Sequence, residues 1–296
     1  MNIVLEVLTV VAPVFLLAAI GWGWTRTRAP YPIDFVTRLT MNISIPALIF
    51  TALMRTKIDP AALRELAGAA LLAYGLLGLL AFLLLALARL PLRTWLAPFV
   101  FGNTGNLGLP LALFAYGEIG LQNAVVVFAI MAILSYTFGV WLVSGAGSPV
   151  ALVREPIVAG TVLGGLFLWR GWSLPPWLMN ALDLLGQMAI PLMLITLGVA
   201  ISRLEARGMG RAFLLSVAKY LLAAGAAGLA GWVFGLGGAA FAILVLQLTT
   251  PVAVSNYFLA VKYDAGPADV AGFVVISTLV AIVALPATLA LLFRFL

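Results

Sequence analysis

Four side-chain amides in this sequence each stand four residues before a proline, a spacing that could free backbone carbonyls for ligand binding. The pairs are Asn42 with Pro46, Asn106 with Pro110, Gln187 with Pro191, and Gln247 with Pro251. Within a helix, a proline lacks the N–H that would bond the carbonyl four residues earlier, and its ring clashes with that carbonyl. Each motif therefore combines a freed carbonyl and an amide in one residue, which is hydrogen-bonding chemistry suited to a polar ligand.

The elements that must position these motifs belong in a lipid bilayer. The 296 residues are 64% hydrophobic and 9% charged, whereas soluble domains carry roughly 25% charged residues. Apolar stretches near the ~20 residues that a helix needs to cross the hydrocarbon layer recur along the whole chain. Only helices and closed barrels satisfy the backbone in lipid, and these stretches lack the alternation of barrel strands. The sequence predicts an all-α integral membrane protein.

The composition also excludes several kinds of site. The chain has no His and no Cys, which removes the usual zinc ligands, disulfides, thiol catalysis and a Ser/His relay. We expect no metal and no cofactor. The net charge of +6 could favour nucleic acid, but the basic residues are scattered between apolar runs. The lipid bilayer is the expected partner, and nucleic acid is not.

Charges, Pro/Gly clusters and short polar loops divide the chain into ten expected spans. They cover residues 5–24, 35–54, 65–88, 95–115, 121–143, 155–172, 179–201, 211–234, 239–261 and 268–293. Basic residues in loops favour the cytoplasmic side. If the amino terminus lies outside, ten of the basic residues lie on the cytoplasmic side: Arg26, Arg28, Arg38, Arg89, Arg93, Arg154, Arg203, Arg207, Arg211 and Lys262. Five then lie outside: Arg55, Lys57, Arg64, Arg170 and Arg294. We therefore predict a multi-pass protein of the cell (inner) membrane with both termini outside.

The two halves of the chain resemble each other. Pro13, Pro46 and Pro110 are echoed by Pro156, Pro191 and Pro251, at offsets of 143, 145 and 141 residues. This predicts two repeats, residues 1–148 and 149–296. Because each repeat holds five spans, the second must enter the membrane in the opposite sense. Inverted repeats of this kind are common in secondary transporters.

The expected ligand site lies in the fourth and ninth spans, which combine proline with an unusual load of polar residues. Gly105 and Gly108 further loosen the fourth span before Pro110. Two broken helices at symmetric positions should meet near the bilayer midplane, where half-helix amino ends can hold an anion. A packing role for the kinks is the competing interpretation. The candidate ligand-binding residues are Asn103, Thr104, Asn106, Gln247, Thr250, Ser255 and Asn256.

Two further features have open roles. Asn42 with Pro46 and Gln187 with Pro191 could kink scaffold helices beside the site or line the ligand. Lys219 lies nine residues into the eighth span, where a charge is costly. Its ammonium could snorkel to the cytoplasmic boundary, or it could face the cavity and attract an anion. No acid lies between Glu65 and Arg89 in the equivalent third span, so an obvious counter-ion is absent.

Several stretches resemble the auxin efflux carrier family, which includes bacterial malate and malonate permeases. FGNTGNLGLPL at residues 101–111, followed by YGEIGL at 116–121, is similar to the fourth-span signature of that family. NISIPALIF at residues 42–50 resembles its second span. The last two spans are matched by Pro251, Asn256, Tyr257, Ala260, Tyr263, Ser277, Thr278 and ALPAT at 284–288.

This resemblance implies ten spans in two inverted repeats, a fold shared with the bile acid sodium symporters. Spans one, two, six and seven would form a scaffold, and the other six a mobile transport domain. Spans four and nine would cross at Pro110 and Pro251, and Asn103 would contact the substrate. The lysine of an acid–lysine pair found in plant members would be Lys219, without its acid.

The leading hypothesis is a secondary transporter that moves a small organic anion, a carboxylate, by an elevator-type mechanism. A sodium-coupled symporter of a bile-acid-like anion is the alternative, although no acid is placed within the crossing to bind the cation. An intramembrane enzyme is a remote third, because Asp264 and Asp269 lie in a loop. The substrate, the direction of transport, proton or sodium coupling and a homodimer are left open.

Overall fold

The protein is a bundle of helices built around two interrupted ones. A computed structural model describes residues 3–27, 29–56, 58–145, 156–203 and 209–295. Its helices are α1 (Ile3–Trp24), α2 (Ile33–Leu39), α3 (Ile45–Met54), α4 (Pro60–Leu87), α5 (Leu92–Val100), α6 (Leu109–Leu134), α7 (Val140–Ser144), α9 (Pro156–Arg170), α10 (Pro176–Gln187), α11 (Ala189–Arg203), α12 (Met209–Val233), α13 (Gly238–Leu248), α14 (Val254–Lys262) and α15 (Pro267–Phe295). Three π-helical segments join some of them: η1 (Thr40–Ser44), η2 (Thr104–Gly108) and η3 (Ser135–Gly139). The described residues contain no strand, so the prediction of an all-α protein is confirmed.

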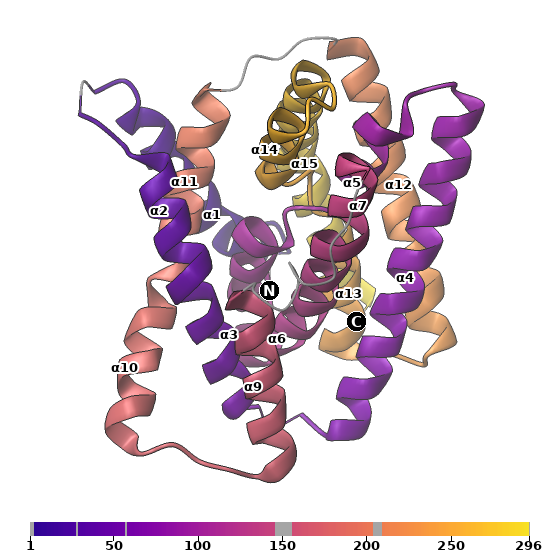
Figure 1. Cartoon of the computed structure of the whole chain (residues 1–296). Coiled ribbons are helices and arrows are strands. Elements are labelled where there is room, and N and C mark those ends of the chain that lie inside the picture. The colour runs from indigo at the N-terminus through magenta and orange to yellow at the C-terminus, as the bar shows by residue number, and fades with distance from the viewer. Residues whose placement is uncertain (1–2, 28, 57, 146–155, 204–208, 296) are drawn as a thin grey trace.

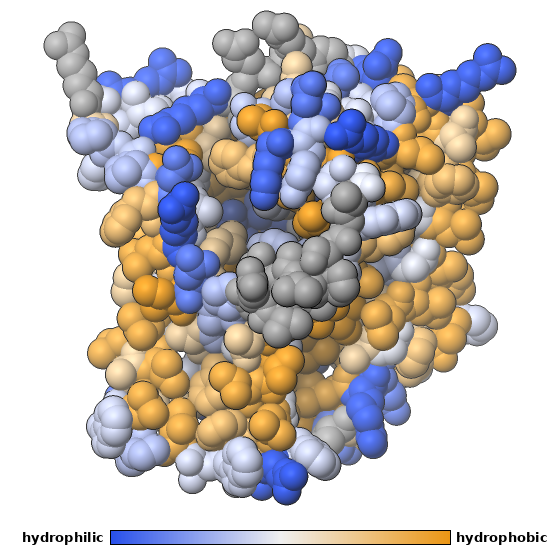
Figure 2. Space-filling model, viewed as in Figure 1, coloured by the Kyte–Doolittle hydropathy of each residue, from blue (hydrophilic) through white to orange (hydrophobic). Residues whose placement is uncertain are grey.

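Length and composition suit these helices to a membrane. In the described residues, seven helical stretches are long and apolar enough to cross a bilayer, and α9 and α13 are shorter apolar helices. Large apolar side chains face outward along them, as Leu71 and Leu83 do on α4. Figure 2 shows apolar side chains over most of the middle and flanks of the visible face, with polar ones gathered toward the top and bottom and in a strip that reaches mid-height on the left. The protein is therefore an integral membrane protein.

The count of ten spans stays a prediction, because one helical stretch is much longer than a single span. It runs over Thr104–Ser144, 41 residues. Within it, Gly117 has φ 60° and ψ −151°, which is not helical. A positive φ of this kind is accessible to glycine at little cost. The bend lies between the expected fourth and fifth spans, which the sequence placed at residues 95–115 and 121–143.

Helices from the two halves of the chain pack together in pairs. α1 packs on α11, α3 on α9, and α4 on α12. Figure 1 shows α2, α10 and α11 on one side, α4 and α12 on the other, and α5, α6 and α13 between them. The boundary predicted between residues 148 and 149 lies outside the described residues, as do Arg28, Lys57, Arg154 and Arg207 of the topology argument.

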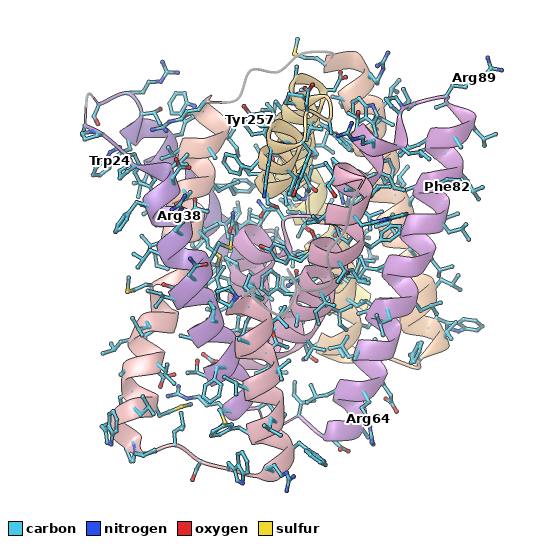
Figure 3. All side chains as sticks on the ribbon, viewed as in Figure 1. Trp24, Arg38, Arg64, Phe82, Arg89 and Tyr257 are labelled. Atoms are coloured by element: carbon cyan, nitrogen blue, oxygen red, sulfur yellow. The ribbon has the colours of Figure 1, made fainter. Side chains whose placement is uncertain are left out.

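Charged residues mark the two ends of the bundle. Figure 3 shows Arg64 and Arg89 at opposite ends of α4, with Trp24 at the same end as Arg89. At the Arg89 end, Arg93 donates a hydrogen bond of 2.6 Å to the carbonyl of Tyr263. At the Arg64 end, Arg55 pairs with Asp183 of α10. These contacts connect helices that are far apart in the sequence.

Glycines allow α9 to approach α3 closely. A Cβ on Gly164 would lie 2.9 Å from Cδ1 of Leu53 and 3.2 Å from Cα of Phe50, whereas a Cβ on Gly165 would meet nothing within 4 Å. We expect Gly164→Leu to lower the free energy of unfolding by about 1 to 3 kcal/mol through overpacking. Gly165→Leu should have little effect. Thermal unfolding of the two purified variants tests this, and equal melting temperatures would show that the glycine contact is not required.

Candidate functional site

Two interrupted helices cross at the centre of the bundle. Helix α5 ends at Val100 and is followed by an extended segment, residues 101–103. Helix α13 ends at Leu248, and a second extended segment follows at residues 251–253. The two segments run antiparallel, with Gly102 opposite Val252. The N–H of Asn103 donates to the carbonyl of Pro251 at 2.7 Å. The broken helices therefore satisfy part of each other's backbone, which lipid could not do.

Side chains satisfy further backbone groups at this crossing. The N–H of Val252 donates to Oγ of Ser277 at 3.0 Å. Nδ2 of Asn256 donates to the carbonyl of Phe101 at 3.0 Å and to that of Ala253 at 3.3 Å. Asn256 is buried, and its amide links the two broken helices through these hydrogen bonds.

Close approach of the two backbones explains Gly102. A Cβ at this position would collide with Oγ1 of Thr250 and lie 3.0 Å from the Thr250 carbonyl. Backbone atoms cannot move aside as a flexible side chain can. We conclude that the crossing requires glycine at position 102.

The amide and proline motifs fold differently in the two halves. In the first half of the chain, the amide of each motif lies in a π-helical segment that ends two residues before the proline. Segment η1 ends before Pro46, and η2 ends before Pro110. A π turn bonds to the carbonyl five residues back, which makes room for proline where an α-helix would clash. In the second half, helices α10 and α13 end at or just after the amide residue. Pro251 therefore lies in the crossing, whereas Pro110 lies in the first turn of α6, beyond it.

A cavity of about 110 Å³ lies beside the crossing. Asn103, Gly105 and Asn106 line it from the start of the η2–α6 helix, and Ala253, Val254 and Ser255 from the start of α14. The first N–H groups of a helix have no partner within it and carry partial positive charge. Two helix amino ends thus converge on one cavity, an arrangement that favours a negatively charged group.

Of the residues described, seven with polar side chains line the cavity: Thr37, Asn103, Asn106, Ser135, Tyr136, Thr196 and Ser255. Asn103 is 4% exposed, and its Nδ2 has no hydrogen-bond partner within the described chain. No charged side chain lines the cavity in the part of the chain that the structure describes. Apolar residues make up most of the remaining wall, including Ile33, Met41, Phe101, Phe128, Met131, Leu197 and Phe258.

Other candidate residues lie near the crossing but away from this cavity. Gln247 is fully buried in α13, opposite Gly108 of η2. Neither its Oε1 nor its Nε2 is hydrogen-bonded within the described residues, and the same holds for Oγ1 of Thr104. Oγ1 of Thr250 donates to the carbonyl of Gln247 at 2.7 Å. These groups form a polar layer inside the crossing.

Lys219 lies in a second, much smaller space of about 10 Å³. It is 2% exposed, and its Nζ has no hydrogen-bond partner within the described residues. Ser216, Thr249, Thr250, Pro251 and Ser277 also line this space. The carboxyl end of α13, just before Thr249, borders the same space, and the partial negative charge of a helix carboxyl end favours a cation nearby. Lys219 thus contacts the crossing and does not line the larger cavity.

The scaffold amides do not reach the cavity. Asn42 and Gln187 are exposed, and Pro46 packs against Gly160 of α9. Pro191 is exposed as well. Four polar residues of the described cavity wall were not among the candidates from the sequence: Thr37, Ser135, Tyr136 and Thr196. All four are polar residues within apolar spans, and this signal could have identified them.

Comparison with known proteins agrees with this architecture. A family model described as a membrane transport protein matches residues 6–152 and 146–289. An uncharacterized transporter of Methanothermobacter thermautotrophicus is 26% identical over 96% of this chain and 95% of its own length. An uncharacterized transporter of Methanocaldococcus jannaschii is 24% identical over 60% of this chain and 61% of its own. The chain is therefore a member of the membrane transport protein family, the auxin efflux carrier-like family that its fourth-span signature resembles.

Proposed function

We propose that this membrane transporter is a secondary carrier for a small organic anion, bound as a carboxylate beside the crossing. The observation that carries the proposal is the convergence of two helix amino ends on one cavity. In its wall lies Nδ2 of Asn103, which has no partner in the described part of the chain. Backbone N–H groups and helix dipoles are the usual means of holding an anion without a counter-charge. A carboxylate there would accept bonds from donors that otherwise lack partners.

The wall of the cavity favours an acid with one charge and an apolar body. Phe101, Phe128 and Phe258 offer aromatic surface, and no charged side chain in the described lining would pair with a second carboxylate. An unpaired buried charge is far more costly than an unpaired neutral group. The cavity therefore suits an apolar monocarboxylate better than a dicarboxylate such as malate.

The position of the cavity supports an elevator-type movement. We group α1, α2, α3, α9, α10 and α11 as the scaffold, and α4 to α7 with α12 to α15 as the transport domain. Thr37, Leu197 and Ala200 of the scaffold form one wall, and Asn103, Phe128 and Ser255 of the transport domain form the other. A ligand at this boundary would move with the crossing when the transport domain slides along the scaffold.

Reciprocal packing supports the two inverted repeats, residues 1–148 and 149–296. α1 packs on α11 and α3 packs on α9. The first span of each half thus pairs with the second span of the other half. Glycines at both contacts repeat this reciprocity, because Gly21 of α1 abuts Ile195 and Gly164 of α9 abuts Phe50 and Leu53. A pseudo-two-fold axis in the membrane plane accounts for both pairs.

For the orientation, we propose that both termini lie outside. The chain has no cysteine, so single cysteines can be introduced without background. Thr27 and Glu118 are exposed, in the loop after α1 and at the bend of α6. We expect an impermeant thiol reagent added to whole cells to label Glu118→Cys and to spare Thr27→Cys. The reverse pattern would place the termini inside.

Counterflow in proteoliposomes tests the proposed function. Vesicles loaded with an unlabelled acid are assayed for uptake of the same radiolabelled acid, with indole-3-acetate and phenylacetate compared with malate. We expect counterflow with the aromatic monocarboxylates, and no competition by phenylacetamide, which keeps the apolar body and removes the charge. Varying sodium and pH identifies the coupling ion. Equal competition by the amide would show that the site does not select anions.

A further inference from the structure

A basic pocket and an apolar groove meet at one end of the α1–α11 pair. The pocket is open, about 450 Å³ in volume, and its lining includes Trp24, Arg26, Tyr31, Ser202 and Arg203. It holds two arginines and, within the described lining, no acid. The groove measures about 180 Å³ and is almost wholly apolar. α1 and α11 contribute to both.

The transition from groove to pocket follows the chain along both helices. On α11, Ile201 lines the groove and the next two residues, Ser202 and Arg203, line the pocket. On α1, Trp22 lines the groove, and the guanidinium carbon of Arg26 lies 4.5 Å from the centroid of the Trp22 ring. The apolar groove and the basic pocket are therefore lined by residues only one to four positions apart on the same two helices.

We infer that this surface binds an anionic phospholipid, with its phosphate headgroup at Arg26 and Arg203 and an acyl chain in the groove. Arg203 uses one guanidinium nitrogen to donate to the carbonyl of Tyr31 at 3.1 Å, which leaves further donors for a phosphate. Tryptophan is enriched at the headgroup level of a membrane, and Trp22 and Trp24 lie beside Arg26 at the carboxyl end of α1. Basic pockets between membrane helices bind acidic headgroups in this way.

The groove is lined by helices of both the scaffold and the transport domain as grouped above. Its walls come from Phe15 and Ala19 of α1, from Leu197 of α11, and from Thr278 and Ile282 of α15. A chain lodged there would lie between the scaffold and the transport domain. If the elevator movement proposed above is correct, this lipid would change its rate, but binding of the lipid does not depend on that movement.

The test measures lipid binding to the purified full-length protein by native mass spectrometry. Phosphatidylglycerol and phosphatidylcholine with the same acyl chains are titrated separately. We expect phosphatidylglycerol to bind ~25-fold more tightly than phosphatidylcholine. Each of the two arginines near the membrane surface should contribute about fivefold. Arg26→Gln combined with Arg203→Gln should abolish the preference. The matched control, Arg89→Gln with Arg211→Gln, removes two exposed basic residues at the same end of the bundle and should keep it.

Two further arms separate a lipid from a free phosphate and guard against misfolding. Ala19→Phe fills the groove, leaves both arginines in place, and should weaken phosphatidylglycerol by tenfold or more. Inorganic phosphate at millimolar concentration should not displace the lipid. An undiminished preference in the double arginine variant would overturn the inference, as would unchanged affinity in Ala19→Phe. Displacement by inorganic phosphate would show an anion site without a lipid.

Discussion

Replacement of Asn103 by alanine is expected to weaken binding of an apolar monocarboxylate by about tenfold or more. The Nδ2 of Asn103 is a buried donor without a partner among the described residues, in the wall of a cavity that two helix amino ends face. A hydrogen bond to a charged ligand contributes ~1.5 to 3 kcal/mol, and each 1.4 kcal/mol is tenfold in affinity. Because Asn103 makes no side-chain hydrogen bond in the described structure, its removal should leave the melting temperature nearly unchanged.

Asn42 supplies a matched control. It has the same side chain, stands in the same kind of motif, is exposed, and does not line the cavity. Isothermal titration of the two variants should show a loss for Asn103→Ala and wild-type affinity for Asn42→Ala. Wild-type affinity in both variants would show that the bound carboxylate does not contact Asn103.

Asn256 requires a different expectation from the one its position suggests. As a polar residue in a broken helix, it was a candidate ligand-binding residue. Its amide instead bonds the carbonyls of Phe101 and Ala253. Asn256→Ala would leave these carbonyls without that donor, which should lower the free energy of unfolding by ~1 to 3 kcal/mol. We therefore expect a lower melting temperature in this variant, in contrast to Asn103→Ala.

Replacement of Lys219 by methionine is expected to reduce anion affinity about fivefold or more while keeping the protein folded. Two unit charges about 10 Å apart attract by roughly 1.7 kcal/mol at an effective dielectric constant near 20. Lys219 is 2% exposed and lies next to the crossing, so water would screen a positive charge there only weakly. Methionine keeps the length and removes an unpaired intramembrane charge, so the free energy of unfolding should stay equal or rise.

Two comparison variants separate charge from packing at this position. Lys219→Arg keeps the charge, but the space around it is only about 10 Å³, so we expect lower stability. Lys262→Met removes an exposed lysine and should not change affinity. Titration with a carboxylate and with its neutral amide gives the readout, because loss of charge should affect the carboxylate alone. An unchanged carboxylate affinity in a folded Lys219→Met protein would make Lys219 purely structural.

Much of the architecture follows from local sequence, because lipid imposes few choices on an apolar chain. The low charge content and the long apolar stretches predicted an all-α membrane protein, and α4 and α12 agree with the expected third and eighth spans to within a few residues. The bend at Gly117 lies where the boundary between spans four and five was expected. The signature at residues 101–111 pointed to the family that the whole-chain match shows.

The exact place of the break in the fourth span could not be predicted from local rules. Proline chemistry favoured Pro110, yet the helix is interrupted at residues 101–103. Partners distant in sequence hold it there, since Asn103 bonds Pro251 and Phe101 bonds Asn256. Near Pro110 the π-helical turn accommodates the proline without a break. The same limit applies to Asn103 and Asn256, which are equivalent in type and differ only in what surrounds them.

Protection of a cysteine in the cavity wall tests the central claim most directly. Ser255→Cys is nearly isosteric, lines the cavity, and would be the single thiol in the chain. We predict that an apolar monocarboxylate slows its reaction with a thiol reagent, at concentrations that match the binding constant of the variant. The corresponding amide should not do so, and Glu118→Cys, away from the cavity, should react at the same rate with and without ligand. An unchanged rate for Ser255→Cys at saturating ligand, in a variant that still binds, would contradict the placement of the anion beside the crossing.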